Sequence, residues 1–167
     1  MVDALRPVRI LIVDEEGGLT DVVRRALHLE GWDTSVASTG ADALIAVPVF
    51  APDIILLDMM LPDLRGTEVA AQLRAAGLAT PIVFVTGRTE HEDRMAAFAA
   101  GADEYLTKPF GLDELVATLE PIVRRLGLTE HSRRVGDVVI DTLTNEAWRG
   151  DERLFLTPGE LGRLLAS

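Results

Sequence analysis

The chain has 167 residues, of which 48% are hydrophobic and 26% charged, and its formal net charge is −11. This composition indicates a folded protein and argues against disorder or a surface that binds nucleic acid along its whole length. The absence of cysteine excludes disulfides and thiolate metal sites, and we find neither a signal sequence nor an apolar run of membrane-spanning length, so we expect a cytoplasmic protein with no membrane partner.

Short apolar runs alternate with amphipathic stretches up to about residue 125. The predicted strands cover residues 8–13, 33–37, 54–57, 82–85 and 104–106. The predicted helices cover residues 19–27, 41–50, 67–76, 92–100 and 112–125. We expect Pro48 to end or kink the second helix and Pro121 to kink the fifth. Strict alternation of strands and helices predicts an α/β fold with a parallel, doubly wound sheet that is covered by helices on both faces.

Polar residues follow four of the five predicted strands. Asp14 and Glu15 follow the first, Asp58 the third, Thr86 the fourth and Lys108 the fifth. Open parallel sheets place their binding sites just beyond the carboxyl ends of the strands. The sequence therefore predicts one site at this edge of the sheet.

The residue types at this edge favour phosphoryl transfer to a carboxylate. Crowded carboxylates repel one another and require a cation, and oxygen ligands alone favour Mg²⁺. Asp58 is then a candidate covalent acceptor, since aspartyl phosphates are known intermediates. Lys108 supplies the positive charge that a phosphoryl group needs, and it is the single lysine in a chain with 15 arginines. Thr86 offers a hydroxyl donor.

Each of these residues has a simpler interpretation by itself. A carboxylate at a strand end is usually a turn residue or a helix cap, and an isolated Lys108 is usually a surface charge. Tyr105 is by default a half-buried core aromatic, and the pair Met59 and Met60 is by default packing. The joint placement of the polar groups at one edge is what favours a site.

Four segments resemble the receiver domains of response regulators, specifically those of the OmpR/PhoB class. They are residues 10–15 (ILIVDE), 52–62 (PDIILLDMMLP), 81–87 (PIVFVTG) and 101–110 (GADEYLTKPF). The resemblance implies a flavodoxin-like (βα)5 fold and a regulator that is not an enzyme. It also implies a cis bond between Lys108 and Pro109.

The resemblance implies a role for each residue of the site. A sensor histidine kinase would donate a phosphoryl group to Asp58, with Lys108 and Thr86 binding the phosphoryl oxygens. Thr86 and Tyr105 would be the switch residues. The Mg²⁺ ligands implied by the family are Asp14, Glu15, Asp58 and the backbone carbonyl of Met60.

Some positions depart from the family pattern. Glu15 stands where the family mostly has Asp, and we expect its longer arm to disturb direct Mg²⁺ coordination. The family usually forms homodimers through its fourth helix, fifth strand and fifth helix, using ion pairs. Ala99, Thr118 and Glu120 replace charged partners there. We expect dimerisation through this face to be weak, apolar or different.

The last part of the chain has a different pattern. Residues 122–167 have a net charge of zero, whereas residues 1–121 have a net charge of −11. We interpret residues 1–125 as the receiver, 126–134 as a linker and 135–167 as the start of a winged-helix DNA-binding domain. Strands are predicted at 135–141, 146–149 and 153–156, and a helix begins after Thr157 with a Thr157–Glu160 capping box.

No recognition helix follows, so we expect DNA binding only in an intact, longer form. The chain is either a piece of a longer regulator or a naturally short one. In both cases we expect Leu161, Leu164 and Leu165 to have no complete core to enter.

Three alternative functions remain open. The chain could act as a stand-alone phosphoryl-accepting receiver without a role on DNA. A Mg²⁺-dependent phosphatase is a second alternative, but such enzymes usually carry an acid two residues after the nucleophile, where this chain has Met60. A flavodoxin-like binding module is the third, although the acidic segment 15–18 (EEGG) would repel phosphate.

Overall fold

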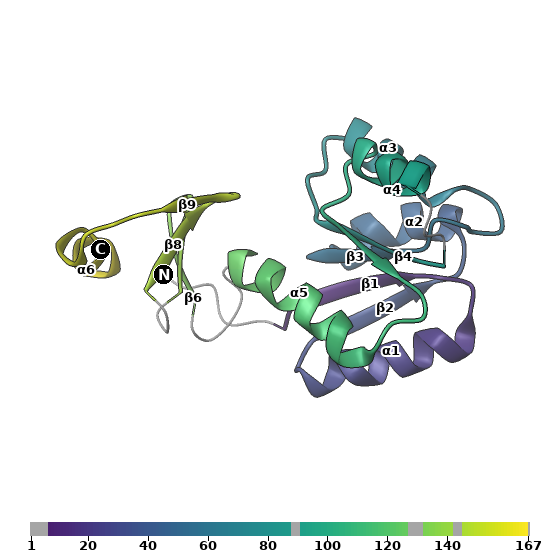
Figure 1. The fold of residues 1–167 in the computed structure, drawn as a ribbon, viewed down its shortest axis with the longest axis horizontal. Coiled ribbons are helices and arrows are strands. Elements are labelled where there is room, and N and C mark those ends of the chain that lie inside the picture. The colour runs from purple at the N-terminus through teal and green to yellow at the C-terminus, as the bar shows by residue number, and fades with distance from the viewer. Residues whose placement is uncertain (1–6, 88–90, 127–131, 142–144, 167) are drawn as a thin grey trace. The chain divides into compact units, whose positions relative to one another are not determined.

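The computed structural model describes residues 7–87, 91–126, 132–141 and 145–166, which form two compact units (Figure 1). One unit, called here the receiver unit, contains residues 9–118. The other, called here the C-terminal unit, contains residues 119–166 together with residues 7–8. No helix among the described residues is long and apolar enough to cross a membrane.

All ten elements predicted before residue 126 are present. The strands are β1 (Arg9–Val13), β2 (Asp33–Ala37), β3 (Ile54–Leu57), β4 (Ile82–Thr86) and β5 (Glu104–Thr107). The helices are α1 (Gly17–Leu29), α2 (Gly40–Phe50), α3 (Gly66–Ala75), α4 (His91–Ala99) and α5 (Leu112–Leu126). Pro48 does not end α2, which continues to Phe50 and stops where Ala51 adopts a positive φ of 51°. Pro121 likewise lies inside α5.

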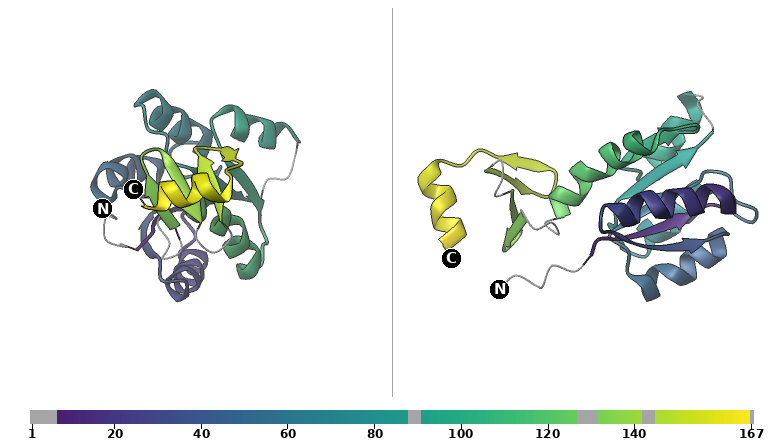
Figure 2. Two further views of the ribbon diagram at one scale, coloured as in Figure 1. Left: turned by 90° about the vertical axis from the view of Figure 1, so that its left-hand side faces the viewer. Right: turned by 90° about the horizontal axis from the view of Figure 1, so that it is seen from below.

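The five strands form one parallel sheet in the order β2-β1-β3-β4-β5. Helices α2, α3 and α4 lie on one face of this sheet, and α1 lies with the first half of α5 on the other (Figures 1 and 2). Every residue of β3 and β4 is buried because helices cover both faces. The predicted doubly wound α/β fold is therefore confirmed.

A tight loop joins β3 to α3 and sets the position of Asp58. The N–H of Gly66 donates to the carbonyl of Met59 at 2.8 Å, which closes the loop. A Cβ on Gly66 would lie 2.3 Å from the carbonyl oxygen of Asp58 and 2.8 Å from the Phe84 ring. Only glycine permits this close approach of two backbone segments.

The C-terminal unit contains a second, antiparallel sheet and a helix. Its strands are β6 (Ser132–Val135), β7 (Val138–Asp141), β8 (Glu146–Arg149) and β9 (Glu152–Leu154), paired in chain order, and α6 (Pro158–Ala166) follows. The single strand predicted at 135–141 is wrong. Gly136, with a φ of 62°, lies in a turn there, and residues 132–134 of the expected linker lie in β6.

Three leucines of α6 have a core to enter, contrary to the expectation from the sequence. Leu161, Leu164 and Leu165 are partly buried and pack against Val138, Ile140 and Ala147 of the small sheet. The antiparallel strands bury these residues on the face that α6 covers. The predicted capping box is confirmed, since the N–H of Glu160 donates to the Thr157 hydroxyl at 3.2 Å and the N–H of Thr157 donates to the Glu160 carboxylate at 3.3 Å.

Candidate functional site

Backbone hydrogen bonds bring the strand-end residues together at one edge of the parallel sheet. The N–H of Asp58 donates to the carbonyl of Val13 at 2.9 Å, and the N–H of Lys108 donates to the carbonyl of Thr86 at 2.8 Å. These bonds continue the sheet by one residue beyond β3 and β5. Asp14, Asp58 and Lys108 consequently meet although they lie far apart in the sequence.

The Lys108 ammonium bridges two carboxylates. Its Nζ lies 2.7 Å from Oδ2 of Asp14 and 3.1 Å from Oδ2 of Asp58. The side chains of Asp14 and Asp58 are 6% and 11% exposed, so both pairs are shielded from water. Charge-assisted hydrogen bonds in such surroundings are stronger than those at a surface. The three residues form a preorganised polar cluster.

The other carboxylate oxygens are held by backbone N–H groups. Oδ1 of Asp14 accepts from the N–H of Glu16 at 2.9 Å, and Oδ1 of Asp58 accepts from the N–H of Met60 at 3.0 Å. Each carboxylate thus has one oxygen fixed by the backbone and one directed to Lys108. Both side chains are oriented before any ligand binds.

Burial and charge shift the pKa values of this cluster in identifiable ways. Burial raises the pKa of Asp58 above its ordinary value, although hydrogen bonds from Met60 and Lys108 oppose this. Burial lowers the pKa of Lys108, but its hydrogen bonds to Asp14 and Asp58 outweigh that effect, and the net change is upward. Lys108 therefore stays charged at neutral pH.

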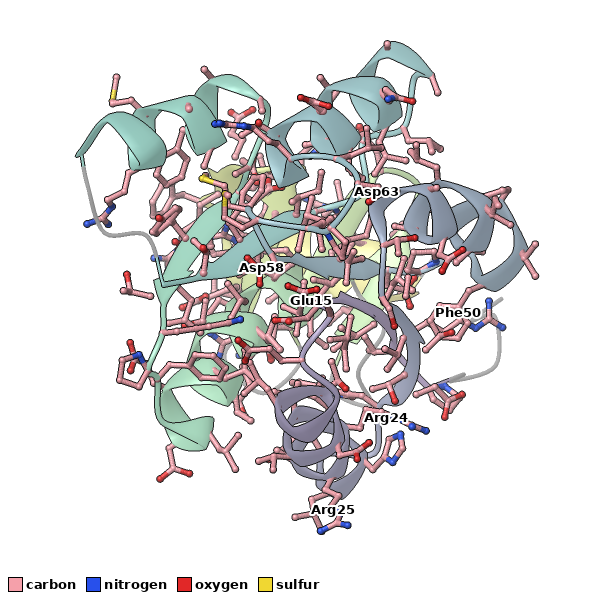
Figure 3. The ribbon with its side chains drawn as sticks, turned by 90° about the vertical axis from the view of Figure 1, so that its right-hand side faces the viewer. Glu15, Arg24, Arg25, Phe50, Asp58 and Asp63 are labelled. Carbon is pink, nitrogen blue, oxygen red and sulfur yellow. The ribbon has the colours of Figure 1, made fainter. Side chains whose placement is uncertain are left out.

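A solvent-accessible cleft of about 630 Å³ opens over Asp58. Its walls include Glu15, Met60, Thr86 and Lys108, and Figure 3 shows Glu15 beside Asp58 at this edge. Glu15 is exposed, whereas Thr86 is 1% exposed. The cleft makes the Asp58 carboxylate accessible from the solvent side.

The carboxylates next to Lys108 offer Mg²⁺ two protein ligands and not three. Within the described ranges, no three Asp, Glu or His side chains lie close enough together to hold a metal ion. Mg²⁺ does not require three, because it is commonly bound through one or two carboxylates and keeps several waters. Asp14 and Asp58 both contact the same ammonium, so this pair of carboxylates satisfies that requirement.

The two candidate switch residues lie on the same face of the sheet. Thr86 pairs with Thr107 and Phe84 pairs with Tyr105, so Tyr105 and Thr86 both point toward the face that α4 covers. Tyr105 is 8% exposed and belongs to the core cluster on this face. The peptide bond between Lys108 and Pro109 is cis, as the family resemblance implied.

Sequence reasoning missed two residues that contact this region. Oε2 of Glu16 lies 4.0 Å from the Lys108 Nζ, and the run of three acids after β1 was the available signal. The guanidinium carbon of Arg94 on α4 lies 5.4 Å from the centroid of the Tyr105 ring. No sequence signal links Arg94 to Tyr105, since only the packing of α4 on β5 brings them together.

The chain is similar to a known domain family and to several named regulatory proteins. The family model described as the response regulator receiver domain matches residues 10–120. The transcriptional regulatory protein TrcR of Mycobacterium tuberculosis is 40% identical over 158 residues, which are 92% of this chain and 62% of TrcR. Response regulator MprA of Mycolicibacterium vanbaalenii is 39% identical over 163 residues, covering 95% of this chain and 71% of MprA. The chain thus spans less than two thirds of TrcR.

Solved structures resemble the receiver part. A putative response regulator from Chloroflexus aurantiacus aligns with a TM-score of 0.67 and 30% identity, covering 72% of this chain and all of that one. A two-component response regulator from Clostridium difficile aligns with a TM-score of 0.69 and 28% identity, covering 71% of this chain and 98% of that one.

Proposed function

Because the chain belongs to the response regulator receiver family, we propose that Asp58 is its phosphoryl acceptor and that a sensor histidine kinase is the donor. The observation that carries this proposal is the Lys108 ammonium, which lies 3.1 Å from Oδ2 of Asp58 and 2.7 Å from Oδ2 of Asp14. A reactive carboxylate next to a fixed positive charge is what an incoming phosphoryl group requires.

In the proposed reaction, an Asp58 carboxylate oxygen attacks the phosphorus atom. A bond forms between that oxygen and phosphorus, the bond from phosphorus to the donor nitrogen breaks, and the nitrogen keeps the electron pair. The backbone N–H of Met60 holds the other oxygen at 3.0 Å, which fixes the orientation of the attacking group. Lys108 compensates the negative charge that the phosphoryl oxygens bring.

Mg²⁺ is the cofactor that the donor set supports. Asp14, Asp58 and the backbone carbonyl of Met60 would hold it, and the exposed Glu15 at the rim of the cleft would contribute directly or through water. The ion would neutralise negative charge on the transferring phosphoryl group. The contacts with Lys108 hold the two aspartates close to each other.

The proposed readout is a change in the position of Thr86 and Tyr105. A phosphoryl group on Asp58 adds charge beside Thr86, whose hydroxyl would donate to it. Tyr105 lies on the same face of the sheet, and its ring would change position because Thr86 vacates space next to it. The surface of α4, β5 and α5 would then change, and we propose an atypical homodimer there that lacks the usual ion pairs.

Transcription regulation is proposed from the names of the relatives. TrcR is named a transcriptional regulatory protein and MprA a response regulator, and both are longer than this chain. We propose that an intact, longer form binds DNA. A location in the cytoplasm and the domain limits 1–125, 126–134 and 135–167 remain predictions.

The phosphatase alternative finds no support in the cleft. The residue two positions after Asp58 is Met60, which lines the cleft and is 45% exposed. A thioether cannot act as a general acid or base. The relatives carry the names of regulators and not of enzymes. We therefore propose slow loss of the phosphoryl group from Asp58 and no turnover.

The test is incubation with acetyl phosphate and Mg²⁺, followed by intact mass. We expect the wild type to gain one phosphoryl group and Asp58→Ala to gain none. Asp33→Ala is the matched control, because Asp33 begins β2 at the opposite end of the sheet. EDTA should prevent the gain. Phosphorylation of Asp58→Ala equal to that of the wild type would refute the assignment.

A further inference from the structure

We propose that Arg94 is a positioning residue that holds the Tyr105 ring against the core and so biases the switch toward its inward position. The role of Tyr105 as the switch rests on the proposed function. The contact between Arg94 and Tyr105 does not, and it can be tested separately.

The geometry of the contact is that of a cation over an aromatic face. The Cζ of Arg94 lies 5.4 Å from the centroid of the Tyr105 ring. A cation within about 6 Å of a ring centroid is attracted by the negative face of the ring. Arginine suits this place because its planar, weakly hydrated guanidinium stacks on rings better than a lysine ammonium does.

The placement follows from how α4 lies on the sheet. Ala97 of α4 is fully buried, whereas Arg94, one helical turn earlier, is exposed. Long side chains on a helix lean toward its N-terminus. The Arg94 guanidinium therefore covers the outer side of the ring, while Phe84, Ala97 and Met59 belong to the core cluster that contains Tyr105.

Two of the contributions that hold Tyr105 inward differ in chemistry. The core cluster supplies apolar contact on the inner side of the ring, and Arg94 supplies charge on the outer side. An outward rotation of the ring would break the cation–π contact. Removing the charge should therefore raise the ratio of outward to inward ring positions by roughly two- to five-fold, as expected for such a contact at an exposed site.

This bias would act whether or not Asp58 is phosphorylated. Arg94 contacts the ring and not the phosphorylation cleft, whose walls come from other residues. A contact that favours the inward position in both states reduces the change that phosphorylation can produce at Tyr105. The proposal therefore predicts a small response in the wild type and a larger one without the Arg94 charge.

The test uses the fact that Tyr105 is the only tyrosine of the chain. 3-Fluorotyrosine incorporated into the full chain gives one ¹⁹F signal, and broadening by a soluble paramagnetic agent reports the exposure of the ring. The variants are Arg94→Met, which keeps the length of the side chain but removes the charge, and Arg94→Lys, which keeps the charge. Each is measured with and without beryllium fluoride and Mg²⁺, an analogue of the phosphoryl group.

The matched control is Arg153→Met in the C-terminal unit. Arg153 makes the same kind of contact, with its Cζ 5.0 Å from the centroid of the Phe155 ring. The control changes the net charge of the chain by the same amount as Arg94→Met. We expect it to leave the Tyr105 signal unchanged.

We expect Arg94→Met to increase the exposure of the ring and its response to beryllium fluoride, and Arg94→Lys to recover most of the wild-type signal. The proposal is overturned if Arg94→Met matches the wild type, or if Arg94→Lys behaves like Arg94→Met. Intact mass after acetyl phosphate is measured on the same samples. Failure of the wild type to be phosphorylated would count against the proposed function alone, because the comparison without beryllium fluoride still tests the contact.

Discussion

The two units of the chain bury their sheets to different degrees. In the receiver unit, β3 and β4 are buried along their entire length and helices lie on both faces. Among the described residues of the C-terminal unit, the buried cluster of the small sheet consists of Val138, Ile140 and Ala147, and α6 has no buried residue. Buried apolar area is the main source of stability. The difference shows that Asp58, the proposed acceptor, follows a strand whose backbone is covered by helices on both faces.

The largest effect is expected from a methyl group at Gly66, where two backbone segments of the receiver unit lie close together. Gly66→Ala would put a Cβ 2.3 Å from the Asp58 carbonyl oxygen, so the loop must move. We expect a loss of about 3 kcal/mol or more in the free energy of unfolding, as for severe overpacking. Chemical denaturation followed by Trp32 fluorescence, in a Trp148→Phe background, would measure it.

Gly162→Ala in α6 is the control for this substitution. A Cβ at Gly162 meets nothing within 4 Å, and the residue lies inside a helix. We expect a gain of about 0.5–1 kcal/mol in the C-terminal unit, because alanine favours helix over glycine. Trp148 fluorescence in a Trp32→Phe background reports on this unit. A comparable loss from both substitutions would contradict the account of Gly66.

A second comparison concerns leucines in the two cores. Leu57 on β3 is fully buried, whereas Leu164 on α6 is only partly buried. We expect Leu57→Ala to cost about 2–5 kcal/mol because it leaves a cavity in a closed core. We expect Leu164→Ala to cost about 1 kcal/mol. Urea unfolding of Leu57→Ala would be followed by Trp32 fluorescence in the Trp148→Phe background, and that of Leu164→Ala by Trp148 fluorescence in the Trp32→Phe background. Equal losses in the free energy of unfolding would show that the two cores are equally closed.

The third comparison is between two aspartates of the receiver unit whose pKa values move in opposite directions. Burial raises the pKa of Asp58, so its ionised form is unfavourable in the folded state. The stability that its neutral form contributes is present at acidic pH and is lost as the pH rises through the raised pKa. We therefore expect Asp58→Asn to stabilise the unit at pH 7 in metal-free buffer, with a gain that shrinks toward acidic pH.

Asp63 provides the opposite case. The N–H groups of Ala41 and Gly40, at the start of α2, donate to its carboxylate and lower its pKa. The stability that its ionised form contributes is present above the ordinary pKa and is lost as the pH falls through the lowered one. We expect Asp63→Asn to destabilise the unit at pH 7 and to lose this effect in acid. Thermal unfolding across the pH range measures both, and shifts of the same sign would be inconsistent with this assignment.

The smallest predicted effect contrasts two helix starts. Arg65 occupies the N-cap of α3 without any side-chain hydrogen bond to the helix, whereas Thr157 caps α6 through the N–H of Glu160. We expect Arg65→Asp to stabilise the receiver unit and Thr157→Ala to destabilise the C-terminal unit, each by about 1 kcal/mol. Denaturation midpoints followed by Trp32 and Trp148 fluorescence would show whether stability rises in Arg65→Asp and falls in Thr157→Ala. A loss of stability in Arg65→Asp would mean that Arg65 has another role.

Local patterns determined the elements of the receiver unit. Runs such as Ile54–Leu57 and Ile82–Val85 are apolar at every position, which a strand covered on both faces requires. The alternation of these strands with helices then predicted the parallel sheet, and with it the edge where Asp14, Asp58 and Lys108 lie. In the C-terminal unit the pattern was weaker, and the turn at Gly136 that separates β6 from β7 was missed.

Tertiary structure alone decided what surrounds those residues. The sequence could not show that Lys108 contacts both Asp14 and Asp58 while Glu15 stays exposed, because backbone hydrogen bonds between distant segments set those distances. Nor could it show Arg94 over Tyr105, since the contact depends on how α4 lies on β5. Periodicity reports which face of an element is buried, whereas the partner on that face is set only when the elements pack together.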